Sequence, residues 1–229
     1  MRTMTREKQD QLTPKDAFRL LQSGNTRFLA NLRANRNLLT QVNETGDDQF
    51  PFATILSCID SRTSAELIFD QGLGDIFSIR IAGNFIDEDI LGSMEFTAAI
   101  AGAKLILVLG HSRCGAIKAA CDNVVFGHLT SVVEKIRPSV ELTRENGARD
   151  SSNAAFVNNV AVANVRASVK GIYERSSVLR DLVDQGKLAI IGGHYDVQTG
   201  AVEFFVEDSI SKETLAEAPS GESFAGAAE

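Results

Sequence analysis

The sequence predicts an α/β fold: a mostly parallel β-sheet, with four parallel strands and a C-terminal antiparallel edge strand, flanked by helices. Apolar runs of strand length alternate with segments of helical periodicity along most of the chain. The run 104–109, Lys-Leu-Ile-Leu-Val-Leu, is too apolar for a sheet with one solvated face, which favours a parallel sheet covered on both sides. With 229 residues, 44% of them hydrophobic, the chain is long enough to bury a single large core.

The first element is a helix over Pro14–Leu32, with Thr13 as N-cap and proline in the first turn. The apolar patterns after it predict strands at 52–57, 75–80, 104–109, 187–191 and 200–206, and helices at 65–69, 90–101, 114–121, 156–173 and 177–185. We expect residues 1–210 to form one domain, with 14–34 as an N-terminal helical arm. Residues 211–229 are small and acidic and are expected to form a flexible tail.

Charge and cysteine content narrow the class of protein. A net charge of −7 disfavours binding to a phosphate backbone, so no nucleic-acid partner is expected. No segment approaches the roughly 20 apolar residues that cross a bilayer, and the N-terminal stretch has no apolar signal region, so no membrane partner is expected either. Three cysteines cannot all pair within one chain, which favours reduced thiols and a cytoplasmic location.

Two short strings carry the candidate chemistry. Cys58 follows one predicted strand and His111 follows another, and Cys114 begins the next helix. If the two strands are neighbours, about 4.8 Å apart, all three side chains can reach one zinc ion and leave a fourth position to water. A His-x-x-Cys string alone is a weak signal, and Cys58 alone is more often a small buried hydrophobe. Asp60 and Arg62, in the same string as Cys58, could equally be an ordinary surface charge pair.

Six motifs in order resemble the β-class carbonic anhydrases over nearly the whole chain. The matching stretches are 57–62 (Ser-Cys-Ile-Asp-Ser-Arg), 74–75 (Gly-Asp), 80–84 (Arg-Ile-Ala-Gly-Asn), 93–96 (Ser-Met-Glu-Phe), 110–116 (Gly-His-Ser-Arg-Cys-Gly-Ala) and 195–200 (Tyr-Asp-Val-Gln-Thr-Gly).

The resemblance implies a zinc enzyme with one Zn²⁺ per chain, bound by Cys58, His111 and Cys114. It implies Asp60 and Arg62 as a catalytic dyad that orients a zinc-bound hydroxide for reversible hydration of CO2 to bicarbonate and a proton. It also implies a homodimer, or a dimer of dimers, with the N-terminal helix wrapped on the partner.

A further residue points to the plant-type, or type I-like, subgroup. Gln49 lies nine residues before Cys58, where such members carry a glutamine that donates to the substrate oxygen; on composition alone it could be an ordinary loop residue. The chain has no tryptophan, which members with an alternative inactive state use in a second bicarbonate site. We therefore predict an open, water-bound zinc with Asp60 paired to Arg62.

The substrate pocket is expected to be narrow and apolar. The resemblance and the small size of the glycines assign to it Phe77, Ala82, Gly83, Phe96 and Gly115, although the two phenylalanines could be plain core. Phe96 stands where many members have tyrosine, which puts a tyrosine role in proton transfer in doubt. Ala65 stands where proline is common, which should affect only the turn.

Three other residues receive structural interpretations. Cys121 lies two helical turns, about 10 Å, from Cys114, too far to share the ion, and is predicted to be core. His128 and His194 could relay protons, but ordinary histidines are favoured. The alternatives left open for the whole chain are a zinc hydrolase acting on CS2 or COS, and a catalytically silent zinc-binding or thiol protein.

Overall fold

The computed structural model describes residues 3–211 and Leu215. A five-stranded sheet has the order β2-β1-β3-β4-β5. Its first four strands are parallel, and β5 pairs antiparallel with β4. The predicted fold class is confirmed. The strands are β1 (Ala53–Ser57), β2 (Ile76–Arg80), β3 (Leu105–His111), β4 (Ala189–Tyr195) and β5 (Val202–Phe204).

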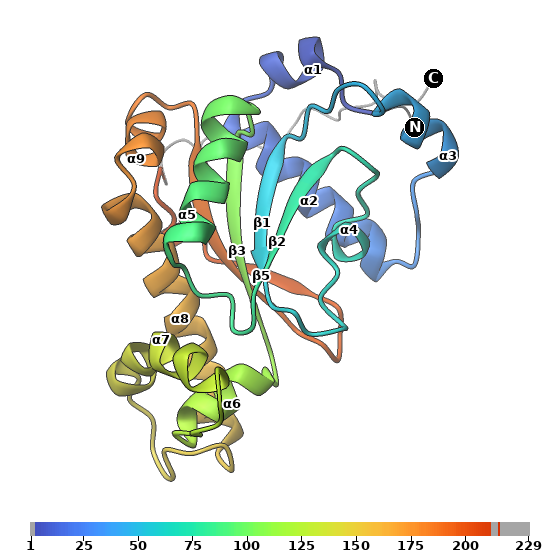
Figure 1. Cartoon of the computed structure of the whole chain (residues 1–229). Helices are drawn as coiled ribbons and strands as arrows, with labels where there is room; N and C mark the ends of the chain where they lie inside the picture. Colours follow the sequence, from blue (N-terminus) through green and yellow to red (C-terminus); the bar gives the residue numbers. More distant parts are fainter. Residues whose placement is uncertain (1–2, 212–214, 216–229) are drawn as a thin grey trace.

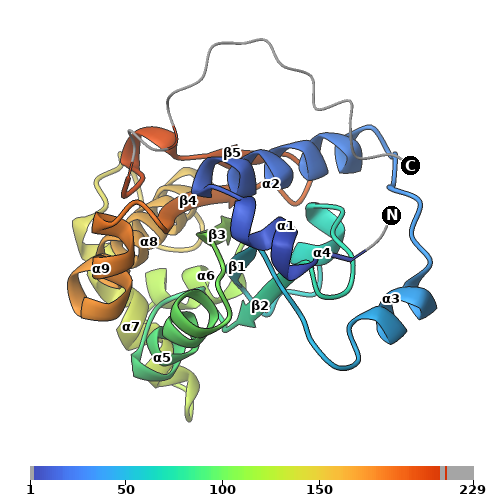
Figure 2. The ribbon, with the colours of Figure 1, turned by 90° about the horizontal axis from the view of Figure 1, so that it is seen from above.

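Helices cover both faces of the sheet (Figures 1 and 2). Against one face pack α2 and α4, and against the other pack α5, α8 and α9. The helices are α1 (Arg6–Gln11), α2 (Pro14–Leu29), α3 (Leu38–Glu44), α4 (Ala65–Ile68), α5 (Glu88–Glu95), α6 (Gly115–Cys121), α7 (Leu129–Leu142), α8 (Ala154–Arg175) and α9 (Ser177–Asp184), with a π-helical turn η1 (Phe96–Ile100) and a 3₁₀ turn η2 (Val206–Asp208).

Three of these helices were not predicted. Helices α1 and α3 have only six and seven residues, too short to show a clear apolar stripe. Helix α7 contains Pro138, which weakens a helical prediction. The predicted helix at 90–101 is also divided, because its last turn widens into η1.

Strands β3 and β4 both run further than their apolar patterns indicated. Each ends in residues that include glycine, whose missing side chain hides the strand periodicity. At Gly110 an added Cβ would lie 2.6 Å from Val165 Cγ2, so the bare backbone is what lets α8 pack against β3. Because β3 is longer than predicted, His111 is its last residue rather than the residue that follows it.

The first long helix packs on its own chain. Thr13 and Asp16 form a capping box and Pro14 begins α2, as the sequence indicated. The apolar face of α2, with Ala17, Phe18 and Leu21, is buried in the core that it forms with the sheet. The apolar stripe of α2 is therefore buried against its own sheet. Contact of the N-terminal helix with a partner stays a prediction.

Two other expectations concern the ends and surface of the chain. The predicted tail 211–229 lies outside the described residues except for Ser211 and the buried Leu215. Among the helices of residues 3–211, none is long and apolar enough to cross a membrane.

Candidate metal centre

The carboxyl ends of two neighbouring strands bring the candidate ligands together. In the β1/β3 register Ser57 lies beside Leu109, so Cys58 leaves β1 next to the end of β3, where His111 stands. Cys114 is the N-cap residue of α6. The ligand atoms of Cys58, His111 and Cys114 all lie within 4.8 Å of one another, and all three residues are buried.

The donor atoms fit a tetrahedral metal ion. The two sulfur atoms are 3.9 Å apart, close to the spacing of about 3.8 Å that two zinc–sulfur bonds of 2.3 Å make in a tetrahedron. Nδ1 of His111 lies 3.0 Å from the Ser112 carbonyl oxygen, to which it donates. Nε2 is then the lone-pair atom, and it is buried without a hydrogen-bond partner among the described residues. A soft cation such as zinc matches two thiols and one imidazole.

The two thiols differ in their tendency to ionise. A hydrogen bond from Cys114 lowers the pKa of Cys58 to about 4, with smaller contributions from His111 and the Gly83 N–H. The hydrogen bond with Cys58, together with burial, raises the pKa of Cys114. Without a cation the pair thus keeps one proton, and a metal ion that binds both sulfur atoms must displace it.

Asp60 and Arg62 form a two-point ion pair beside this group. Arg62 Nε donates to Asp60 Oδ1 at 2.9 Å and Nη2 to Oδ2 at 2.8 Å, and the Arg62 backbone N–H also donates to Oδ1 at 3.0 Å. The hydrogen bonds from Arg62 hold the pKa of the Asp60 carboxyl well below its usual range. Asp60 is therefore a carboxylate at neutral pH, with both oxygens facing a fixed cation.

The loop that carries Cys58 and Asp60 is held by two residues that the sequence analysis did not assign. Thr63, which is buried, donates its hydroxyl to the carbonyl oxygens of Cys58 (3.0 Å) and Asp60 (2.9 Å). Arg80 donates to the same two carbonyls from Nε (3.0 Å) and Nη2 (2.7 Å). Arg80 stands in one of the matched motifs, but its contact to this loop depends on the β1/β2 pairing and has no sequence signal.

The predicted pocket residues divide into two groups. Gly83 donates its N–H to Cys58 Sγ at 3.4 Å and follows the half-buried Ala82. A Cβ on Gly115 would meet nothing within 4 Å, so there is open space beside the start of α6. Phe77, Phe96 and Gln49 lie elsewhere in this chain.

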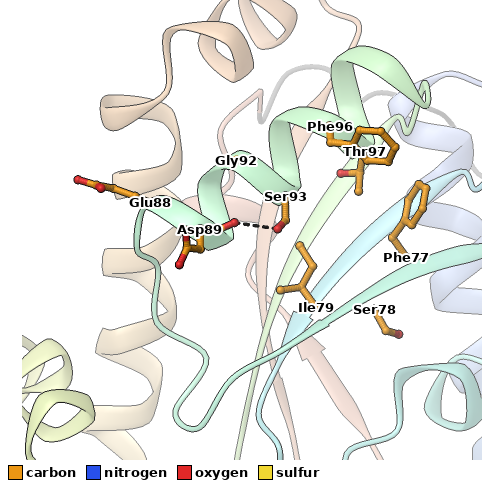
Figure 3. Close-up of a pocket in the computed structure, with 9 residues that line it drawn as sticks. All are labelled: Phe77, Ser78, Ile79, Glu88, Asp89, Gly92, Ser93, Phe96 and Thr97. Carbon is orange, nitrogen blue, oxygen red and sulfur yellow. Dashed lines mark hydrogen bonds between the residues drawn. The ribbon is translucent and has the colours of Figure 1, made fainter. Parts of the chain in front are cut away.

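Phe77 and Phe96 lie together in a separate surface hollow between β2 and α5 (Figure 3). Their ring centroids are 6.4 Å apart. Phe77 is beside Thr54 in the sheet, four residues or about 13 Å before Cys58 along β1. Gln49 is exposed and precedes β1, at the opposite end of that strand from the metal centre. One chain does not bring these three side chains to the candidate ion.

Of the remaining cysteine and histidines, only His194 neighbours the ligand group. Cys121 is buried in the cluster formed by α6, α7 and α8, as predicted. His128 is exposed and precedes α7. His194 is half-buried on β4, where burial, and then the nearby His111, lowers its pKa.

Comparisons with known proteins agree with this arrangement. A family model described as carbonic anhydrase matches residues 53–202. Carbonic anhydrase 2 of Mycobacterium tuberculosis is 37% identical over 194 residues, which cover 82% of this chain and 90% of that protein. The carbonic anhydrase of Mycolicibacterium smegmatis is 35% identical over 197 residues, which cover 83% of this chain and 92% of that protein.

Solved structures share the fold. The β-carbonic anhydrase of Coccomyxa in complex with acetazolamide aligns with a TM-score of 0.64 at 24% identity, covering 71% of this chain and 75% of that one. A β-carbonic anhydrase of Aspergillus fumigatus aligns with a TM-score of 0.65 at 23% identity, covering 87% and 95%. One of two tetrameric β-carbonic anhydrases of Sordaria macrospora gives 0.62 at 19% identity, covering 83% and 97%.

The fold and the site define a class, an α/β enzyme with a cysteine and histidine group that could hold a metal ion at the carboxyl edge of a parallel sheet. The chain belongs to the β-class carbonic anhydrase family, whose reaction is the hydration of CO2.

Proposed function

We propose that this chain catalyses the zinc-dependent, reversible hydration of CO2 to bicarbonate and a proton, with one Zn²⁺ held by Cys58, His111 and Cys114. The observation that carries the proposal is the buried ligand group, with its unpartnered His111 Nε2, next to the carboxylate of Asp60. When bound, zinc supplies the Lewis acidity that makes water a nucleophile near neutral pH.

Asp60 and Arg62 would give that nucleophile its direction. Oδ1 of Asp60 already accepts two hydrogen bonds from Arg62, whereas Oδ2 accepts only one, from Nη2, and keeps a free acceptor position. Asp60 would accept a hydrogen bond from the attacking oxygen and turn its lone pair toward the carbon of CO2. Arg62 keeps Asp60 ionised and commits it to this acceptor role, because its fork contacts both oxygens.

We also propose that a second copy of this chain completes the pocket, in a homodimer or a dimer of dimers. Strand β2 is an unpaired edge of the sheet, and Phe77 and Phe96 lie beside it in the open hollow of Figure 3. A partner packed over this edge would cover them and place them, with Gln49, near an active site. The need for free thiols at Cys58 and Cys114 fits a reducing cytoplasm.

Metal analysis and stopped-flow CO2 hydration test the proposal. The wild-type protein should hold about one zinc per chain and hydrate CO2 well above the buffer rate, and Cys58→Ser should lose the zinc. Asp60→Asn should keep the zinc and lose on the order of 100-fold in hydration rate. The matched control is Asp181→Asn on the exposed face of α9, which should leave the zinc content and the hydration rate unchanged. Full zinc loading with hydration no faster than buffer would refute the assignment.

A further inference from the structure

A buried turn after β2 lies against the candidate ligand Cys58. The Gly83 N–H donates to Cys58 Sγ at 3.4 Å, and the turn is closed by a hydrogen bond from the Asn84 N–H to the Ile81 carbonyl at 3.0 Å. Gly83 has φ 78° and Asn84 has φ 41°, so both occupy the left-handed region. This conformation aims the Gly83 N–H at the sulfur; glycine adopts it without steric cost, whereas at Asn84 it is stabilised by the surrounding structure.

Helix α8 supplies that support from the far side of the turn. Asn164, which is buried, donates its Nδ2 to the Gly83 carbonyl oxygen at 2.8 Å. One turn further along the same face, the buried Ser168 donates its hydroxyl to the Asn84 carbonyl at 3.4 Å. The two peptide groups that follow the donating N–H are therefore both tied to one rigid helix.

Packing fixes the turn on its other side. A Cβ on Gly83 would lie 2.5 Å from Ile136 Cδ1 and 3.3 Å from the Cβ of Ala116. Gly83 thus packs closely against α6, whose N-cap residue is Cys114, and against α7. With α6 and α7 on one side and Asn164 on the other, the N–H has little freedom to turn away from Cys58.

We propose that Asn164 is a positioning residue of the metal centre. It holds the Gly83 peptide so that the N–H keeps donating to the Cys58 sulfur when the metal is bound, and it makes no contact with the metal or the substrate itself. This inference rests on the metal site proposed above. Its chemistry is that of an outer hydrogen bond to a metal ligand, here relayed through one backbone turn.

The hydrogen bond is expected to change how much electron density the Cys58 thiolate donates to the metal. An N–H donor withdraws charge from the sulfur, so Cys58 donates less to the cation. In a centre with two thiolates this partly restores Lewis acidity that the sulfur ligands remove. Without the hydrogen bond, the metal centre should activate water only at higher pH.

The test compares Asn164→Leu and Ser168→Ala with the control Asn158→Leu, which is exposed on the same helix. Zinc affinity is measured by competition with a chromophoric chelator, and the Co²⁺-substituted proteins are examined for the thiolate-to-cobalt absorption band. The midpoint of CO2 hydration against pH is recorded, and thermal unfolding reports on general stability. Ser168→Ala keeps the test informative if Asn164→Leu folds poorly.

For Asn164→Leu we expect zinc affinity to fall about 10- to 100-fold. The cobalt band should move to longer wavelength and the pH midpoint should rise, with smaller changes in the same direction for Ser168→Ala and none for Asn158→Leu. A lower unfolding temperature combined with an unchanged cobalt band and an unchanged zinc affinity would overturn the proposal and leave Asn164 a structural role only. The cobalt band and the affinity do not depend on turnover, so failure of the CO2 assignment would be seen separately.

Discussion

At the scale of single residues, Asp70 links three segments of the chain. Its carboxylate accepts hydrogen bonds from Arg27 at the end of α2, from Arg36, and from the backbone N–H of Ala34. The side chain of Arg36 is only 7% exposed, and its Nη2 also donates to the Asp70 carbonyl oxygen. Asp70 itself has φ 43°, a left-handed conformation, so these contacts also support its backbone.

Removal of this carboxylate should destabilise the protein strongly. Asp70→Ala leaves the buried Arg36 guanidinium without its counter-ion, which costs about 3–5 kcal/mol of unfolding free energy. Asp208→Ala is a matched control, because its partner Arg166 is 55% exposed and such pairs are worth about 1 kcal/mol or less. Urea unfolding at neutral pH measures both. Equal losses for the two variants would contradict the argument.

A second aspartate predicts an unusual pH dependence. Burial raises the pKa of Asp75, although its carboxylate accepts a hydrogen bond from the Gly72 N–H at 2.7 Å. The folded protein therefore binds this proton more tightly than the unfolded chain does. Its contribution to stability is present below the unfolded pKa of about 3.9 and is lost as pH rises through the higher folded pKa.

The variant Asp75→Asn removes this titration. Relative to wild type, its unfolding free energy should increase, meaning a more stable fold, as pH rises from about 4 through the raised pKa of Asp75, and the difference should then level off. Urea unfolding of the metal-free, reduced proteins at a series of pH values gives the difference between the two curves. A difference that stays constant with pH would show that Asp75 titrates normally.

At the scale of elements, one glycine decides how close α2 lies to the end of α4. A Cβ on Gly24 would lie 1.7 Å from the carbonyl oxygen of Phe69, the C-cap residue of α4. The next residue, Asn25, donates to the carbonyl oxygens of Ile68 and Gly200. Helix α2 therefore contacts the end of α4 through its backbone at this point.

The substitution Gly24→Ala should separate these elements. The clash is with backbone rather than with a flexible side chain, so we expect a loss of at least about 1–3 kcal/mol in unfolding free energy. The neighbouring Ser23→Ala, on the exposed side of the same helix, should be neutral or slightly stabilising. Thermal or urea unfolding measures the stability of both variants. A Gly24→Ala protein as stable as wild type would mean that α2 can move away from α4 without cost.

At the scale of the whole molecule, the unpaired edge β2 and the hollow beside it predict the assembly. Phe96 is 52% exposed and Ile100, in the same π-helical turn, is 75% exposed. Apolar side chains of this size next to a free sheet edge are typical of a surface that a partner covers.

A charge placed on this surface should break the assembly. Phe96→Lys is expected to lower the molecular mass seen in sedimentation by at least half and to reduce CO2 hydration, because the pocket would lose its second chain. The control Phe126→Lys changes a residue that is 73% exposed in the loop between α6 and α7 and should alter neither. A wild-type monomer with full activity would contradict the proposed dimer.

Those parts of the fold that have a clear apolar pattern or a helix-capping pattern could be predicted from the sequence. The apolar runs predicted where the five strands lie along the chain, and Thr13 with Pro14 marked the start of α2. The short helices α1 and α3 and the glycine-rich ends of β3 and β4 could not be predicted, because their residues pack without a periodic apolar stripe.

The sequence by itself predicted the candidate ligand set, since Cys58 and His111 stand at the ends of patterns that indicate strands and Cys114 stands at the start of a pattern that indicates a helix. The tertiary structure decided which residues surround them. Hydrogen bonds from Thr63 and Arg80 hold the loop that carries Cys58. A hydrogen bond from Asn164, 81 residues further along the chain, holds the turn at Gly83. The tertiary structure also showed that Phe77, Phe96 and Gln49 lie away from the metal centre of their own chain. Such contacts depend on how strands pair and helices cross, and that geometry comes from packing of the whole core rather than from any local pattern.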